Sequence, residues 1–306
     1  MKFGLSLNVN ESLPDVLAKS LKAEDIGLDY LWISDLPTQR YAPVVTAALV
    51  SKVLNIRIGV GLISPFLHTP QQIASALTTL MESGKRPFEL CIGPGDRDEL
   101  RRVGIDLEEI SNIPEYMLNS RREISERLKK RGLECKIWLG AQSPGLLKIA
   151  SSFDGVLLNY SSPDMIDWAL RTVREAQHEI PTLVGIFAPS YVYRDPRPEM
   201  RQLLQFASAK VALGTSNSVL KKFSMLESLK PAKKQLLSKS LDVSTLKNIP
   251  PDIIERFSIF KSLDQLPRYV DEIDRLGVEH TVFSYPQGHS IETIEDLGDG
   301  LSRIRK

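Results

Sequence analysis

Short glycine-rich and polar segments that follow apolar runs are the positions in this sequence with the means to do chemistry. The clearest spans residues 88–96, where an apolar run ends in Gly93-Pro94-Gly95 and Asp96 follows at once. The glycines let a ligand approach main-chain N–H groups closely, and the proline stiffens the turn. An ordinary strand-to-helix turn with Asp96 as the helix cap explains the same residues. Both interpretations stay open.

A second such segment is a candidate anion site. Gly140, Ala141, Gln142 and Ser143 follow an apolar run and directly precede a predicted helix. Free N–H groups at such a place favour a phosphate, although a plain turn is the alternative. Asn159 ends the next apolar run and supplies an amide of the kind that holds flat heterocycles.

Ionisable side chains are few among these segments. The carboxylates are Glu11, Asp35 and Asp96, and His68, before Thr69-Pro70, is expected to serve as a helix-entry residue. No nucleophilic triad is indicated, and no Cys-x-x-Cys or His-x-x-x-His pair predicts a metal site. Amides, glycines and few acids suit hydride transfer between two bound organic molecules, which the protein aligns and shields.

The order of elements that must position these residues predicts a (β/α)8 TIM barrel, an α/β fold, as a single domain over residues 1–306. An open doubly wound sheet is the competitor. Ligands of such barrels bind at the loops that follow the strands, where the candidate residues fall. The predicted strands are 2–8, 30–34, 57–62, 88–93, 136–141, 155–160, 181–189 and 280–285. The predicted helices are 13–27, 42–52, 69–83, 144–152, 164–179, 201–213, 263–276 and one from 290.

The regular spacing breaks after the seventh strand. Residues 217–258 are expected to form a helical insertion, with Pro231 and Pro250-Pro251 as breakers. A lid over the site and a wider subunit interface are equally compatible with it.

Composition narrows the classes of partner. Lys and Arg total 39 against 38 for Asp and Glu, a formal net charge of +1, which calls for neither nucleic acid nor an anionic membrane. The two cysteines fit buried reduced thiols, and no apolar run is long enough to span a bilayer. No signal segment precedes the first strand, so a cytoplasmic protein is expected.

Several motifs, in order along the chain, resemble the luciferase-like monooxygenase superfamily. They include Trp32-Ile-Ser-Asp35, the segment 59–70, Gly93-Pro-Gly-Asp96, the segment 139–150 and the segment 155–159. Within the superfamily they most resemble the coenzyme F420-dependent 5,10-methylenetetrahydromethanopterin reductases. The resemblance covers residues 1 to about 105, resumes at 137–170 and returns over about 255–300.

The resemblance implies a fold, a reaction and a set of site residues. The fold is a luciferase-like (β/α)8 barrel, usually a homodimer, and the reaction is hydride transfer between F420 and a methylene-tetrahydropterin, acting on CH–NH donors. NADPH or NADH as the donor and FMN are the alternative cofactors. A bulge with a cis peptide would fall at Gly61-Leu62, against the ring. Asp35 and Asn159 would meet the ring or its side chain, residues 140–143 would hold the phosphate, and Gly93, Gly95 and Asp96 would border the site.

The sequence departs from the family pattern at two positions. Leu36 stands where family members have His after the Asp, and Ser6 stands where the reductases have a Glu proposed as the acid. Glu11 is a candidate replacement for that acid, or a solvated turn residue. An FMN-dependent luciferase-like monooxygenase and a non-catalytic ligand-binding paralogue are therefore the alternative functions.

Overall fold

A closed barrel of eight parallel strands forms the centre of the computed structural model, which describes residues 1–84, 88–176, 182–236, 243–246 and 248–304. The strand order is β6-β5-β4-β3-β2-β1-β9-β7, and the pairing of β6 with β7 closes it. All these pairs are parallel. The barrel strands are β1 (Lys2–Leu7), β2 (Tyr30–Ile33), β3 (Arg57–Ile63), β4 (Glu89–Ile92), β5 (Lys136–Ala141), β6 (Gly155–Leu158), β7 (Leu183–Tyr193) and β9 (His280–Ser284). The predicted (β/α)8 fold is confirmed, and the open sheet is not formed.

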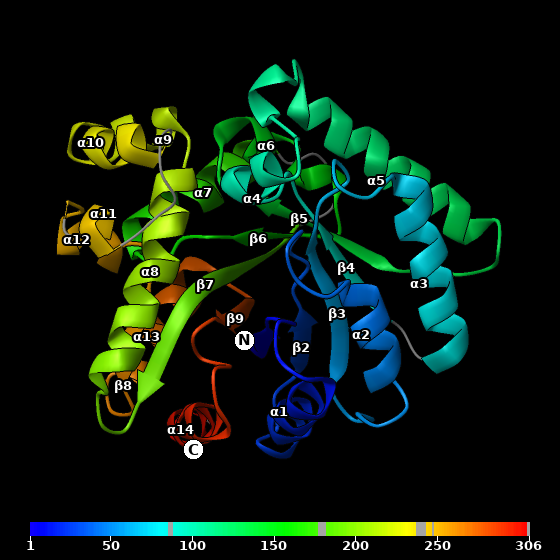
Figure 1. Cartoon of the computed structure of the whole chain (residues 1–306), viewed down its shortest axis with the longest axis horizontal. Helices are drawn as coiled ribbons and strands as arrows, with labels where there is room; N and C mark the ends of the chain where they lie inside the picture. The colour runs from blue at the N-terminus through cyan, green and yellow to red at the C-terminus, as the bar shows by residue number, and fades with distance from the viewer. Residues whose placement is uncertain (85–87, 177–181, 237–242, 247, 305–306) are drawn as a thin grey trace.

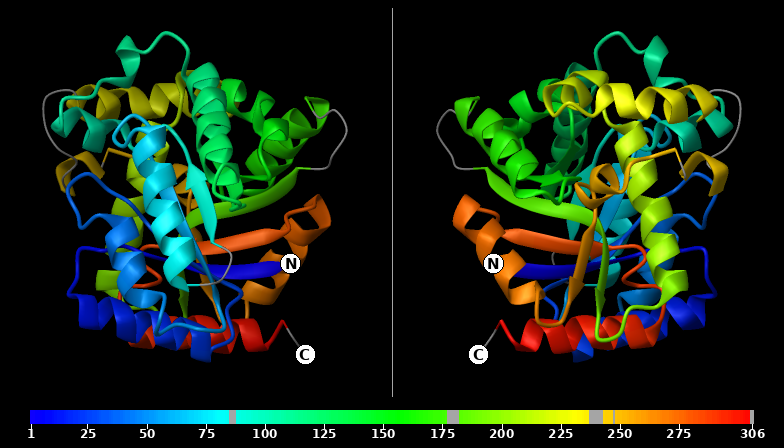
Figure 2. Two further views of the ribbon diagram at one scale, coloured as in Figure 1. Left: turned by 90° about the vertical axis from the view of Figure 1, so that its right-hand side faces the viewer. Right: turned by 90° about the vertical axis from the view of Figure 1, so that its left-hand side faces the viewer.

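Helices surround the barrel on its outer side (Figure 1). Because both faces of each strand are covered, the strands are apolar along most of their length. Helices α1 and α14, from opposite ends of the chain, lie side by side and contact each other (Figure 2). The helices are α1 (Leu13–Asp25), α2 (Ala42–Leu49), α3 (Pro70–Gly84), α4 (Arg97–Arg102), α5 (Ile113–Lys129), α6 (Pro144–Lys148), α7 (Pro163–Glu175), α8 (Pro198–Gly214), α9 (Asn217–Lys222), α10 (Leu226–Leu236), α11 (Val243–Leu246), α12 (Pro251–Glu255), α13 (Leu266–Leu276) and α14 (Ile291–Ser302), with short 3-10 turns η1 (Leu107–Glu109) and η2 (Ala150–Ser152).

Aromatic side chains fill the inside of the barrel below its strand C-termini. Trp32 and Trp138 meet edge to face with ring centroids 6.4 Å apart, and Trp32 Nε1 donates to Nε2 of buried His280 at 3.1 Å. A Cβ at Gly59 would collide with the Trp32 ring and one at Gly155 with the Trp138 ring, so these strand glycines make room for the indoles. The barrel is therefore packed from below, and a ligand must enter from the loop side.

The segment after β7 departs from the expected boundaries. Strand β7 continues to Tyr193, and its last four residues pair with an additional strand, β8 (Ile259–Ser262), outside the barrel. The described parts of 217–258 are helical, as predicted, and α10, α11 and α12 pack on α8. Pro250 and Pro251 begin α12 as expected.

The prediction of Pro231 as a helix breaker is wrong. Pro231 lies inside α10, and fully buried Leu229 and Ala232 hold the turns on either side of it. This packing offsets the loss of the one main-chain hydrogen bond that a proline cannot donate. The end of the predicted helix 164–179, the first residue of the predicted strand 181–189, and residues 237–242 and 247 of the predicted insertion lie outside the described residues. Within the described residues, no helix combines the length and the apolar character that a membrane span requires.

Candidate functional site

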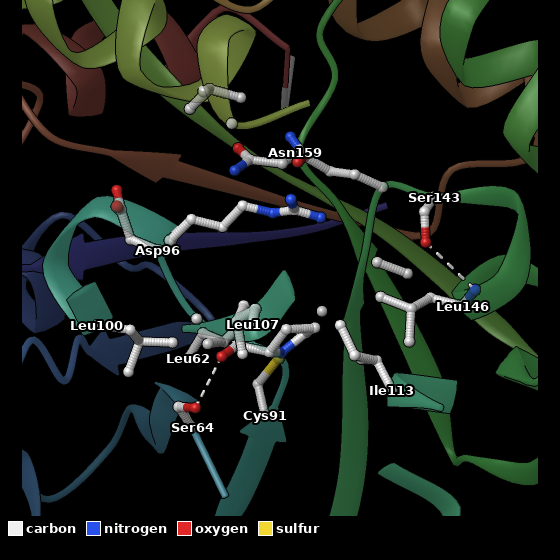
Figure 3. Close-up of a pocket in the computed structure, with 18 of the residues that line it drawn as sticks. Leu62, Ser64, Cys91, Asp96, Leu100, Leu107, Ile113, Ser143, Leu146 and Asn159 are labelled. Carbon is white, nitrogen blue, oxygen red and sulfur yellow. Dashed lines mark hydrogen bonds between the residues drawn. The ribbon is translucent and has the colours of Figure 1, made fainter. Parts of the chain in front are cut away.

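A cavity of about 550 Å³ opens at the C-terminal ends of the barrel strands. Residues from seven of the barrel strands or the loops that follow them line it, together with residues of α4, η1, α5 and α8 (Figure 3). Of the residues predicted for the site, it brings together Asp35, Leu62, Gly95, Asp96, Gly140, Ala141, Gln142, Ser143 and Asn159. The volume lies within the range of small-molecule sites.

The floor of the cavity is formed where β3 bulges. The peptide between Gly61 and Leu62 is cis, at the position that the resemblance implied, and the β3–β4 register shifts between Val60 and Ile63. The Leu62 side chain lies against Gly93 of the β4 end and Gly140 of β5, where Cβ atoms would clash with it. Gly93 and Gly140 therefore shape the floor from behind, and Leu62 itself lines the cavity. Gly61 leaves room for Cys91 of β4.

The loop after β5 forms a second wall. Ser143 accepts a hydrogen bond from Leu146 N at 3.5 Å as the N-cap of α6, and the Gln142 carbonyl accepts one from the Tyr160 hydroxyl. The Gln142 Nε2 atom is buried without a hydrogen-bond partner among the described residues, so it is a donor available to a ligand. Helix α6 has only five residues, so an anion here would rely on the loop N–H groups and Gln142 rather than on a helix dipole.

Asp35 follows β2 and is the most buried carboxylate of the cavity wall, with a side chain 3% exposed. Its Oδ1 accepts a hydrogen bond from Ala42 N at 3.1 Å, and its Oδ2 lies 2.9 Å from Nε2 of His68. The imidazole also contacts the Tyr41 ring, with centroids 4.8 Å apart. Burial, followed by the charge of Asp35, raises the pKa of Tyr41. The pairing of His68 with Asp35 was not expected from the sequence.

Asp96 borders the cavity and caps α4. Its Oδ1 accepts hydrogen bonds from Asp98 N at 2.9 Å and Glu99 N at 3.1 Å, which confirms the capping interpretation. Lys210 of α8 pairs with Glu99 at 3.0 Å across the cavity rim. The pKa of Glu99 is lowered because hydrogen bonds and charges from Lys210 and Arg102 outweigh the opposing effect of burial, which is the largest single contribution.

A lysine of the helical insertion also lies near this rim. Lys233 of α10 donates to the Thr215 carbonyl and to Asn217 Oδ1, and its pKa is lowered to about 8 by burial and then by the charge of Arg97. Arg97 lines the cavity, so α10 and α4 bring two positive charges near each other there.

The structure does not bring Glu11 to the cavity wall. Both carboxylate oxygens accept from buried Lys19, which also donates to the His289 carbonyl, all at 2.5–2.7 Å. Ser6, where an acid was expected by resemblance, is buried and shares a 2.7 Å hydrogen bond with Ser34 Oγ. Leu36 lines the cavity as an apolar side chain.

An apolar wall was also missed by sequence reasoning. Leu100 of α4, Leu107 of η1, Ile110 and Ile113 line the cavity from one continuous segment. Their signal in the sequence is weak because charged residues separate them and no regular period repeats. At the floor, burial raises the pKa of the Cys91 thiol far above its usual range, so this thiol stays protonated.

The comparisons with known proteins agree with this architecture. The family model described as Luciferase-like monooxygenase matches residues 1–113. The chain is 26% identical to the 5,10-methylenetetrahydromethanopterin reductase of Archaeoglobus fulgidus over 94% of each chain.

Solved structures share the fold. The coenzyme F420-dependent tetrahydromethanopterin reductase of Methanopyrus kandleri superposes with a TM-score of 0.80 at 20% identity over 97% of each chain. A monooxygenase of Streptomyces bottropensis superposes with a TM-score of 0.66 at 14% identity over the whole of each chain. The resemblance of this chain to the luciferase-like proteins, and among them to the methylenetetrahydromethanopterin reductases, is confirmed.

Proposed function

We propose that this protein is a coenzyme F420-dependent oxidoreductase that transfers hydride to the one-carbon group of a methylene-tetrahydropterin. The observation that carries the proposal is the cavity at the strand C-termini, with the Leu62 floor, in a chain similar over 94% of its length to a methylenetetrahydromethanopterin reductase. The reductase of Methanopyrus kandleri, which shares the fold, is F420-dependent.

The residues of the cavity fit a flat heterocycle that carries an anionic side chain. Leu62, backed by Gly93 and Gly140, offers a face for the ring, and the Asn159 amide supplies polar contacts beside it. Gln142 Nε2 is a buried donor without a partner among the described residues, which suits the phosphate of such a side chain. When bound, the reduced deazaflavin supplies a hydride.

The protein's own part in this reaction is to bind, orient and exclude water. Leu100, Leu107 and Ile113 give the cavity an apolar lining, and Gln142 and Ser143 give it polar groups. Leu100 and Ser143 lie on opposite sides of the cavity (Figure 3). An apolar wall with few polar groups holds two planar molecules in contact and keeps water from the hydride.

A hydride-transfer assay tests the proposal. Reduced F420 and methylene-tetrahydromethanopterin are mixed with the purified protein, and oxidation of the deazaflavin is followed by absorbance; turnover is expected. The site variant Asn159→Leu should lose at least about tenfold of kcat/KM, a cost of about 1.4 kcal/mol for one polar contact. Asn119→Leu, an exposed position on α5, is the matched control and should match the wild type.

Other outcomes favour the alternative functions. Oxygen consumption with reduced FMN identifies a monooxygenase. Reduction of the methylene-tetrahydropterin by NADPH but not by reduced F420 identifies a nicotinamide-dependent reductase. Tight binding of F420 without turnover identifies a non-catalytic paralogue. Each of these outcomes contradicts the proposed reaction.

A further inference from the structure

We propose that Asp35 and His68 form a proton relay that connects the cavity with solvent, an inference that rests on the proposed function. Reduction of a carbon bound to nitrogen requires a proton as well as a hydride. The relay assigns Asp35 as the proton donor facing the ligand and His68 as the group that exchanges its proton with water.

The geometry places the two groups in series. Asp35 lines the cavity with a side chain 3% exposed, whereas the His68 side chain, 22% exposed, is not part of the cavity wall. Their Oδ2 and Nε2 atoms are 2.9 Å apart, a distance at which a proton passes directly between them. The Ala42 N–H fixes the other oxygen of Asp35 at 3.1 Å, so the carboxylate is held in one orientation.

The other titratable groups of the described cavity wall are less suited to this task. Asp96 sits at the N-terminus of α4 and caps it. Lys210 forms an ion pair with Glu99 at 3.0 Å, and Arg97 forms one with Glu108 at 3.7 Å. The Cys91 thiol holds its proton too tightly to act as an acid near neutral pH, because burial raises its pKa. Asp35 is the cavity carboxylate that also contacts a histidine.

Two titratable groups face the imidazole in the described contacts. Asp35 lies on one side, and Tyr41, from the start of α2, packs on the ring at 4.8 Å between centroids. The pKa of Tyr41 is raised, chiefly by burial, so this phenol stays neutral throughout the working pH range. The His68 main-chain N–H donates to the Ser64 carbonyl at 3.0 Å. This bond holds the backbone of His68 in place just before α3.

The chemical step balances as follows. One C–N bond of the methylene bridge breaks with its electron pair going to nitrogen, which takes a proton from Asp35. The carbon gains the hydride that the donor of the proposed function supplies, and a C–H bond forms. Asp35 takes a proton from His68, and the imidazole takes one from water. Oxidation of the donor releases one proton to solvent for each hydride, so the sum is neutral.

The test separates a relay from a purely structural contact. His68→Gln keeps an N–H donor for Asp35 but cannot shuttle a proton, and His68→Ala removes both. His289→Gln, at an exposed histidine, is the matched control. In single-turnover hydride transfer, the Gln and Ala variants should both slow at least about tenfold, with unchanged F420 affinity. Added imidazole should restore the Ala variant but not the Gln variant, and Asp35→Asn should slow at least about a hundredfold without rescue.

A second readout needs no ligand. Buried His280 also offers an imidazole N–H, because its Nδ1 lies 3.3 Å from the Lys2 carbonyl. In NMR spectra of the ligand-free protein, a second imidazole N–H signal, that of His68, should be present in the wild type and in His289→Gln. It should be absent in His68→Gln and displaced in Asp35→Asn. Thermal melting of each variant shows that it folds.

The outcomes distinguish the two proposals. A His68 N–H signal that does not respond to Asp35→Asn, or His68→Gln turnover equal to wild type, overturns the relay. Absence of hydride transfer by the wild type with F420 overturns the proposed function instead. The NMR comparison then still shows whether Asp35 and His68 are hydrogen-bonded in solution, and without that bond there is no relay.

Discussion

The Leu62 side chain occupies the space beside Gly140 in which a Cβ atom at that position would have to lie. One residue comes from the bulge of β3 and the other from β5, two strands away in the barrel. The floor of the cavity is thus set by a leucine that only glycine neighbours can accommodate, because any larger residue at Gly140 would push Leu62 into the cavity.

Substitution of Gly140 should therefore alter the cavity more than the fold. Gly140→Ala should reduce the free energy of unfolding by about 1–3 kcal/mol through overpacking and should weaken F420 binding. Gly214 also lines the cavity, but a Cβ there would meet nothing within 4 Å. Gly214→Ala is the control and should leave F420 binding unchanged. Urea denaturation and F420 titration measure the two effects, and equal F420 affinity in both variants would refute the role given to Leu62.

Asp96 should contribute a cap rather than a charge to the reaction. Its Oδ1 accepts both hydrogen bonds at the start of α4, and an asparagine oxygen accepts the same two. Asp96→Ala should lower the free energy of unfolding by about 1 kcal/mol, and Asp96→Asn should stay near wild type. Hydride-transfer rates are then compared. A loss of more than about tenfold in Asp96→Asn would show that the carboxylate takes part in the reaction.

The sequence could predict which acidic residues lie near the site, but not which side chains they pair with. The strand order places the loops after β2 and β3 side by side, which predicts that Asp35 and His68 share one face. Their hydrogen bond depends on side-chain directions that spacing does not specify. Glu11 was predicted for the same face, yet Lys19, eight residues along and one helix away, takes its carboxylate.

The fold was largely predictable because each barrel strand is a buried apolar run between turn residues. Strand β8 was not, because four residues that pair with the outer end of β7 leave no such pattern. The prediction of a helix break at Pro231 failed because helix propensity alone places a helix end at a proline. In the structure, the buried side chains of Leu229 and Ala232 keep α10 continuous through this position.

Acid should destabilise the protein through His280. Burial lowers the pKa of His280 from 6.5 to about 4, so the unfolded state binds a proton that the folded state excludes. The free energy of unfolding should fall as the pH drops from about 6.5 towards about 4, by about 3 kcal/mol in total. His280→Gln, which keeps an acceptor for Trp32 Nε1 but cannot ionise, should lack this part of the pH dependence. Urea titrations at pH 7 and pH 5 measure the change in the free energy of unfolding between the two pH values, and His289→Gln should show the same change as the wild type. An equal change in His280→Gln and wild type would contradict the assignment.

The most direct test of the central claim is a parallel titration of the purified protein with coenzyme F420, NADPH and FMN, followed by absorbance and fluorescence. We predict that F420 binds with a dissociation constant of about 1 µM or lower, that NADPH and FMN bind far more weakly, and that Gly140→Ala reduces the F420 affinity. Tight binding of FMN or NADPH in the absence of F420 binding would contradict the assignment of this cavity to a deazaflavin.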